Sequence, residues 1–298
     1  MIEHLNPQPV KPRRVVIIGA GGFVGGAATA RLNAESVPVL ASTRRELDLL
    51  AADAGQLLAD RITAEDSVVL VSAIAPCRTS GQFLDNVAMA RALCAALEKT
   101  VPAHLVYISS DAVYADGASL IDERSCAQPS SLHGAMHAAR EAMLRASYSG
   151  PLCVLRPSLL YGARDPHNGY GPNRFRRLAA EGKDIVLFGQ GEEQRDHVLI
   201  DDLARLVGLV LARRSRGVLN VATGVSVSFR EIADMVVALA GKSVAIKDSL
   251  RQNPISHRHF DITASHKAFP RFHYTSLADG LARVHAEVHG LAQSRGQG

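Results

Sequence analysis

The sequence predicts an α/β fold built on a doubly wound parallel sheet. Short apolar runs, typical of buried strands, alternate with longer stretches of helical spacing. A glycine-rich turn follows the first of these runs. With 298 residues, of which 47% are hydrophobic and 21% charged, the chain is large and apolar enough to bury the core of such a fold, which excludes global disorder.

The composition also excludes several classes of function. The net charge is only +4 and the basic residues are spread along the chain, which argues against nucleic-acid binding. No apolar run approaches the roughly 18 residues that a membrane helix needs, so no membrane partner is expected. The four cysteines lack CxxC spacing, which favours reduced thiols in a cytoplasmic protein. Residues 1–13 have no apolar core typical of a signal peptide and are expected to be flexible.

The first strand, turn and helix are predicted from residues 15–32, VVIIGAGGFVGGAATARL. The apolar run Val15–Ile18 predicts a strand, the glycines a tight turn, and the small residues that follow a closely packed helix. Gly19, Gly22 and Gly25 let the backbone approach a pyrophosphate, and the helix N-terminus offers it free N–H groups. The pattern therefore predicts a Rossmann-type dinucleotide site, the alternative being a glycine-rich turn without a ligand.

The second strand is expected at residues 37–42, and Arg44 follows it. An acidic residue at this turn would hold a ribose 2′-hydroxyl, whereas an arginine accommodates a 2′-phosphate. The sequence therefore favours NADP(H), with NAD(H) as the alternative. Residues 47–49 predict a short third strand, with Asp48 facing the adenine edge.

Alternating elements continue to residue 240. Further strands are expected at 66–73, 103–110, 153–157, 185–188 and 217–222, and helices at 51–60, 83–99, 131–147, 173–182, 201–213 and 229–240. Ligands of such sheets bind beyond the carboxyl ends of the strands, so the glycine turn, Ser72 and Ser110 are expected to lie together. Residues 161–173, rich in Gly, Pro and Asn, predict a functional loop. We expect a dinucleotide-binding domain over 14–160 and, over 161–292, mainly a substrate-binding lobe, part of which returns to the sheet.

Six blocks of sequence resemble the extended short-chain dehydrogenase/reductase family of nucleotide-sugar epimerases, dehydratases and 4-keto reductases. They are GAGGFVG (19–25), RRELDL (44–49), ISSDAVYAD (108–116), LRPSLLYGARDP (155–166), LFGQGEEQRDHVLIDDLA (187–204) and VLNVATG (218–224). The resemblance implies a nicotinamide cofactor, a nucleotide-sugar substrate and a homodimer. It places a dimer seam on the apolar face of residues 86–98 together with the helix at 133–147; the alternative is that this face packs on the sheet.

The resemblance also implies the site residues. Ser110 falls on the catalytic hydroxyl, and Arg195 on the arginine that holds the substrate diphosphate; the alternative for Arg195 is an ion pair with Asp196 or Asp201. The expected substrate contacts are Ser110, Asp111, Tyr114, Asn173 and Arg195, with a packed aromatic as the alternative for Tyr114. The expected cofactor contacts are Gly19, Gly22, Phe23, Val24, Gly25, Arg44, Asp48, Leu49, Ser72, Ala73, His137 and Pro157.

The chain departs from the family at its Tyr-x-x-x-Lys motif, where His133 and His137 stand in HGAMH. A phenol needs a neighbouring cation to act near neutrality, whereas an imidazole titrates near pH 6.5 without one. We therefore expect His133 to be the acid/base beside Ser110, and His137 to bond the ribose hydroxyls. Reduction or epimerisation is favoured over dehydration, because Asp111 offers an acid but no glutamate accompanies it.

Two alternatives to an active enzyme remain. One is a protein that binds NADP(H) and a sugar nucleotide as a regulator or scaffold without catalysis. The other is a metal site, since His133 and His137 share a helix face and Glu141 lies one turn further on. The run lacks the glutamate of HExxH, so no metal is expected. Tyr161 and Tyr170 lie in the long loop as further candidates for ligand contact, and the histidines of the C-terminal region form no ligand set.

Overall fold

The computed structural model describes residues 2–117 and 120–295, and it confirms the predicted α/β fold. Seven strands form the main sheet in the order β1-β10-β6-β5-β4-β2-β3. All neighbours pair in parallel except β1, which runs antiparallel to β10 at one edge. The strands are β1 (Glu3–His4), β2 (Val15–Ile18), β3 (Val39–Ser42), β4 (Ser67–Leu70), β5 (His104–Ile108), β6 (Leu152–Pro157) and β10 (Ser215–Val221).

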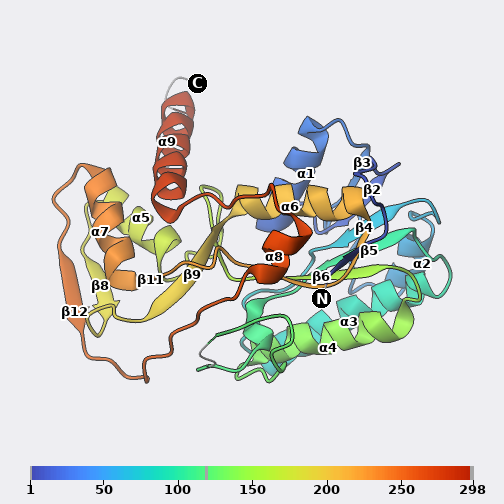
Figure 1. Cartoon of the computed structure of the whole chain (residues 1–298), viewed down its shortest axis with the longest axis horizontal. Coiled ribbons are helices and arrows are strands. Elements are labelled where there is room, and N and C mark those ends of the chain that lie inside the picture. The colour runs from blue at the N-terminus through green and yellow to red at the C-terminus, as the bar shows by residue number, and fades with distance from the viewer. Residues whose placement is uncertain (1, 118–119, 296–298) are drawn as a thin grey trace.

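Helices cover both faces of this sheet (Figure 1). On one face lie α1 (Phe23–Ala34), α6 (Ile200–Arg213) and α8 (Thr263–Ala268), and on the other α2 (Ala54–Ala59), α3 (Ser80–Leu97) and α4 (Leu132–Ser147). Each face has its own apolar core, centred on side chains such as Leu32 and Leu203 on the first and Leu93 and Leu144 on the second. The strands between them are buried on both faces, as expected for a parallel sheet.

A smaller lobe stands beyond one end of the sheet, at the left of Figure 1. Its strands form two small sheets, β11-β9-β7 and β12-β8, and α5 and α7 pack on a third apolar core. Its elements are β7 (Leu159–Tyr161), α5 (Pro172–Ala180), β8 (Ile185–Phe188), β9 (Gln194–Leu199), β11 (Ser226–Ser228), α7 (Phe229–Ala240), β12 (Ile246–Ser249) and α9 (Leu277–Arg295). The chain returns to the main sheet between β9 and β11, through α6 and β10.

Three expectations are corrected. Residues 47–49 form no strand. Leu47 and Leu49 are buried, but they belong to a turn in which Glu46 accepts hydrogen bonds from Thr43. The segment 1–13, expected to be flexible, contains β1, because Glu3 and His4 pair with β10.

The third correction concerns the dimer seam expected on α3. The apolar side chains assigned to that seam lie against the sheet, so the alternative of plain packing holds for this face. They include Ala90, Leu93, Cys94 and Leu97, all buried. No helix in the described ranges is long and apolar enough to cross a membrane.

A candidate active site at the carboxyl ends of the strands

The glycine turn between β2 and α1 has the close backbone approaches that the sequence predicts. Gly19 has a φ of +98°, and a Cβ there would lie 2.7 Å from the backbone nitrogen of Ser72. A Cβ on Gly25 would lie 2.2 Å from the carbonyl oxygen of Gly19. Side chains are therefore excluded at both positions, and the loop can lie closely against a ligand. Gly22 caps α1 without a side-chain bond, which leaves the first N–H groups of Phe23 and its neighbours for an anion.

The turn after β3 lies beside this loop. A Cβ on Gly21 would reach the side chain of Thr43 at 3.6 Å. Arg44 and Asp48 form an exposed ion pair with an N–O distance of 3.6 Å, whereas Leu49 is buried. The guanidinium of Arg44 thus remains accessible to a phosphate.

The ends of β4 and β6 complete this side of the site. The backbone nitrogen of Ser72 bonds the carbonyl of Ile18, which sets Ser72 against the glycine loop, and half-buried Ala73 follows it. Pro157 ends β6 and is buried beside Val221 of β10. The half-buried Val24 lies in the first turn of α1.

The segments that hold Ser110 and His133 pack against each other at a contact that only glycine allows. Ser110 precedes a single 3₁₀ turn, η1 (Asp111–Val113), and its Oγ accepts a hydrogen bond from the N–H of Ala112 at 3.1 Å. A Cβ on Gly134 would lie 1.9 Å from the carbonyl oxygen of Ala112, so the start of α4 packs directly on η1. This packing sets His133 beside the Ser110 turn.

The imidazole of His133 is held in one protonation form. Its Nδ1 accepts a hydrogen bond from the backbone N–H of Cys77 at 3.3 Å. A backbone N–H can only donate, so Nδ1 carries no proton and the proton of the neutral ring lies on Nε2. Burial lowers the pKa of His133, which outweighs the opposite effect of Asp111 and favours this neutral ring.

His137 lies one turn deeper and is 5% exposed. Its Nδ1 is 2.6 Å from the hydroxyl of Tyr107 on β5, and its ring meets that of His133 edge-on, with centroids 4.8 Å apart. Burial holds the pKa of His137 well below its usual range. The pair at the positions of the family motif is therefore two neutral imidazoles.

Two more polar residues follow on the same face of α4, and the sequence reasoning assigned neither of them a role in the site. Arg140 is fully buried; its guanidinium donates to the carbonyl of Ser72 at 2.7 Å and lies 5.3 Å from the centre of the Tyr107 ring. Glu141 accepts hydrogen bonds from Ser109 and from Arg156. The signal for both was their helical spacing from His133, which places all four side chains on one stripe.

His133, His137 and Glu141, the residues of the alternative metal site, do not gather around an ion-sized centre. The carboxylate of Glu141 is held by Arg156 and Arg145, and Nδ1 of His137 faces Tyr107. Across the ranges 2–117 and 120–295, no group of three His, Cys, Asp or Glu side chains has the arrangement of a metal site.

A buried arginine that sequence reasoning missed lies at the substrate side. Arg258 donates to the backbone and carboxylate oxygens of Asp111, at 2.8 and 3.0 Å, and to Asp116 at 2.8 Å. Arg195 enters from β9, ion-pairs with Glu193 and donates to the carbonyl of Ser256. Its partner is therefore Glu193 rather than Asp196 or Asp201. No pattern in the sequence marks Arg258, because it comes from an irregular segment far along the chain.

The side chains of two predicted substrate-binding residues, Tyr114 and Asn173, form hydrogen bonds with other groups of the protein. Tyr114 is 1% exposed; its hydroxyl donates to Asn220 and accepts from Arg156. The alternative of a packed aromatic thus describes Tyr114, and its predicted substrate contact is corrected. The side chain of Asn173 accepts from the N–H of Gly162 at 3.1 Å and donates to the carbonyl of Leu160 at 3.2 Å, so it ties the long loop to β7.

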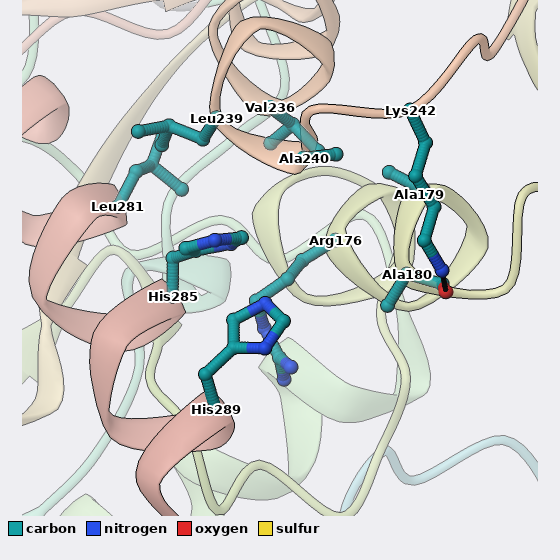
Figure 2. Close-up of a pocket in the computed structure, with 10 residues that line it drawn as sticks. All are labelled: Arg176, Ala179, Ala180, Val236, Leu239, Ala240, Lys242, Leu281, His285 and His289. Atoms are coloured by element: carbon teal, nitrogen blue, oxygen red, sulfur yellow. Dashed lines mark hydrogen bonds between the residues drawn. The ribbon is translucent and has the colours of Figure 1, made fainter.

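The loop tyrosines are also packed inside the lobe. Tyr161 is 1% exposed, and Tyr170 stacks with Phe188 at a centroid distance of 4.7 Å. A separate hollow lies between α5, α7 and α9, with Leu239, Leu281 and the ring of His285 around it (Figure 2). Its volume of about 40 Å³ has room for a few water molecules and not for a nucleotide sugar.

Comparisons with known proteins agree with this geometry. Residues 15–222 match the model of the "NAD dependent epimerase/dehydratase family". The chain is 25% identical to the "Uncharacterized UDP-glucose epimerase YtcB" of Bacillus subtilis, over 98% of this chain and 95% of that protein. It is 26% identical to GDP-L-fucose synthase of Escherichia coli, over 92% and 95% of the two chains.

Solved structures show the same fold. MoeE5 in complex with UDP-glucuronic acid and NAD superposes with a TM-score of 0.79 at 25% identity, over 90% of this chain and 96% of that one. UDP-glucose 4-epimerase of Thermus thermophilus in complex with NAD gives a TM-score of 0.79 at 21% identity, over 93% and 99%.

Proposed function

The chain belongs to the NAD dependent epimerase/dehydratase family, and from that membership we propose that it transfers hydride between NAD(P)(H) and a carbon of a nucleotide-activated sugar. The observation that carries the proposal is the close packing of the start of α4, which holds His133, on the η1 turn that follows Ser110; Gly134 makes this packing possible. It brings a hydroxyl and an imidazole N–H to the carboxyl ends of the strands, beside a loop shaped for a dinucleotide.

The glycine loop fits the cofactor. A Cβ on Gly19 or Gly25 would fill the space that backbone occupies, so the turn must be built from glycine, and free N–H groups of α1 face it. When bound, the nicotinamide ring supplies or accepts the hydride. Arg44 supports a preference for NADP(H) over NAD(H) as part of the proposal, because its exposed guanidinium is free to meet a 2′-phosphate.

The proposed roles at the reacting carbon follow from the hydrogen bonds of the site. As hydride adds to a carbonyl carbon, negative charge develops on its oxygen, and N–H and O–H donors aimed at it stabilise the transition state. We propose that His133 directs its Nε2–H, and Ser110 its hydroxyl, toward that oxygen as hydrogen-bond donors. The neutral imidazole does not give up this proton near neutral pH, so the proton that completes the alcohol comes from water and returns to water in the reverse direction.

The same geometry favours reduction over a full epimerisation cycle. His133 is set as a hydrogen-bond donor by the N–H of Cys77, which suits stabilisation of the negative charge that develops on an oxygen during reduction. An epimerase must also remove a proton from a sugar hydroxyl, and that step requires the imidazole to leave the Nε2–H form. We therefore propose a 4-keto reductase first and an epimerase second.

The substrate side of the proposal rests on the two arginines near Asp111. Arg195 and Arg258 come from different segments; burial lowers the pKa of Arg195, and the charge of Arg258 lowers it further. A guanidinium binds phosphate oxygens in a bidentate manner, so a diphosphate is the group that suits this pair.

Isotope transfer tests the proposal. The protein is incubated with NADPH or NADH deuterated at C4 and with UDP-, GDP- and dTDP-linked 4-keto sugars, and deuterium in the product is read by mass spectrometry. We expect transfer to one class of substrate, and a loss of about 100-fold or more in His133→Ala. The exposed histidine variant His266→Ala serves as a control and keeps the wild-type rate.

No deuterium transfer to any sugar, with cofactor still bound, would favour the alternative of a regulator or scaffold. Unchanged transfer by His133→Ala would remove His133 from the mechanism. A homodimer and a cytoplasmic location belong to the same proposal, and light scattering of the purified protein tests the first.

A further inference from the structure

The second histidine of the pair has a partner that none of the roles above uses. The hydroxyl of Tyr107 lies 2.6 Å from Nδ1 of His137, and both residues are buried. Tyr107 belongs to β5, whereas His137 belongs to α4, so this bond joins the helix to the centre of the sheet. The question it raises is which nitrogen of His137 carries the proton.

The ring of His137 is neutral. It is almost fully buried, and the guanidinium of Arg140 lies over the same Tyr107 ring to which His137 is bonded. Among the described residues, no carboxylate lies within 4.0 Å of the Arg140 side chain to offset its charge. A second positive charge at His137 would therefore be added beside an uncompensated one, on a ring with little exposure to water.

The direction of the bond follows from the phenol. In the described part of the chain, Tyr107 has no hydrogen-bond partner other than Nδ1 of His137. If Nδ1 carried the proton, the buried O–H of Tyr107 would have no acceptor, and an unsatisfied buried donor lowers the free energy of unfolding. Burial raises the pKa of Tyr107 to about 12, so the phenol keeps its proton. Tyr107 therefore donates and Nδ1 accepts.

We propose that Tyr107 is a positioning residue that holds the proton of His137 on Nε2, so that His137 presents an N–H donor to a ribose hydroxyl of the dinucleotide. The inference rests on the proposed function, because it takes the cofactor site as given. His137 Nε2 is not among the polar side-chain atoms that are both buried and without a partner in the described structure, so this nitrogen keeps a small exposure.

The two histidines are then fixed in the same tautomer in the same way. The N–H of Cys77 occupies Nδ1 of His133, and the O–H of Tyr107 occupies Nδ1 of His137. Each ring is left with a single N–H, on Nε2. A phenol and an ammonium also present donors from positions four residues apart on a helix, so two imidazoles in this form keep one donor at each of the two positions.

The test reads the proton directly. Protein labelled with ¹⁵N at histidine is examined without cofactor by long-range ¹H–¹⁵N correlation, which distinguishes the two neutral tautomers, and His137→Ala assigns the signals of His137. We expect the Nε2–H form for His137 in the wild type, and a mixture or the Nδ1–H form in Tyr107→Phe. A wild-type ring protonated on Nδ1, or one unchanged in Tyr107→Phe, would overturn the proposal.

Affinity for the dinucleotide gives the second readout. Titration calorimetry with NADPH and NADH should show about a three- to tenfold weaker binding for Tyr107→Phe, the value of one lost hydrogen bond. Tyr148→Phe is the matched control, because Tyr148 is also buried and donates to the carbonyl of Pro102, away from the site. We expect its affinity to equal that of the wild type.

A double-mutant cycle separates positioning from a general structural effect. If Tyr107 acts through His137, Tyr107→Phe changes nothing further in the His137→Ala background. An equal loss in both backgrounds would contradict the proposal. A wild type that binds neither dinucleotide would refute the proposed function instead, and the tautomer of the free protein would still decide the role of Tyr107.

Discussion

Replacement of Gly134 by alanine should both destabilise the protein and displace His133. In an unconstrained helix, Gly→Ala stabilises by about 0.5–1 kcal/mol. Here the new Cβ would lie 1.9 Å from the carbonyl oxygen of Ala112 and 2.8 Å from Cβ of Pro129. Contacts below 3.0 Å essentially do not occur, so α4 and η1 must separate by about 1.1 Å. We expect this overpacking to lower the free energy of unfolding by about 1–3 kcal/mol.

The same displacement moves His133 away from Ser110. A misplacement of about 1 Å at a reacting centre reduces rates by about 100-fold. We therefore expect Gly134→Ala to transfer deuterium about 100-fold more slowly, with dinucleotide affinity lowered by about tenfold at most, because the glycine loop is untouched and only the donor of His137 moves with α4.

Urea unfolding and isotope transfer measure the two effects on one preparation. Gly81→Ala in α3 is the matched control, since its Cβ meets nothing closer than Thr79 Oγ1 at 4.0 Å. That variant should be as stable as the wild type or slightly more so, and equally active. A Gly134→Ala protein that matched the control in both measurements would refute the close packing of α4 on η1 and the placement of His133 derived from it.

Three further predictions concern acid stability, a buried carboxylate and cofactor choice. Burial lowers the pKa of His104 to about 4 and of His197 to about 3 in the folded protein. Below pH 6.5 the unfolded chain therefore binds more protons than the folded protein, and the free energy of unfolding decreases as the pH is lowered. Between pH 8 and pH 5, the free energy of unfolding measured with urea should fall by about 2 kcal/mol for each histidine. The part due to His104 should be absent in His104→Gln, and the part due to His197 in His197→Gln. Asp196, 1% exposed, accepts bonds from two backbone N–H groups and two hydroxyls, so Asp196→Ala should cost about 3 kcal/mol or more in the same assay. Arg44→Ala should weaken binding of NADPH about tenfold in calorimetry and leave NADH binding unchanged, and equal effects on both cofactors would remove Arg44 from the 2′-phosphate.

The main sheet could be predicted from sequence because its signals are local. Apolar runs ended by glycine or polar residues marked β2, β4, β5 and β6, with ends within a few residues of those observed. The segment 47–49 shows the limit of this reasoning. Its alternating burial has the period of a strand, but the turn closed by Glu46 and Thr43 produces the same burial without a ladder partner.

The site was only partly accessible from sequence for a related reason. Ser110 stands in a block that resembles the family, and His133 stands where the family motif is replaced, so both could be singled out from the sequence; Gly134 explains how their two segments pack together. Tyr107 and Arg258 stand in no such pattern. Each acquires its role from a residue on another element, His137 for the first and Asp111 for the second, and that pairing exists only in the fold.

The hydrogen bonds of the histidine pair bear on the choice between an enzyme and a regulatory binder. A protein that only binds a dinucleotide and a sugar nucleotide needs the glycine loop and the arginines, and it makes no demand on the tautomer of His133. Yet His133 is set as an Nε2–H donor by a backbone N–H from the loop after β4, and His137 by a phenol from β5. These two constraints come from different elements and act on rings four residues apart. The donor on His137 serves dinucleotide binding in either case. A fixed donor on His133, at the start of the helix that packs on the turn after Ser110, is what stabilisation of negative charge on a substrate oxygen requires and simple binding does not.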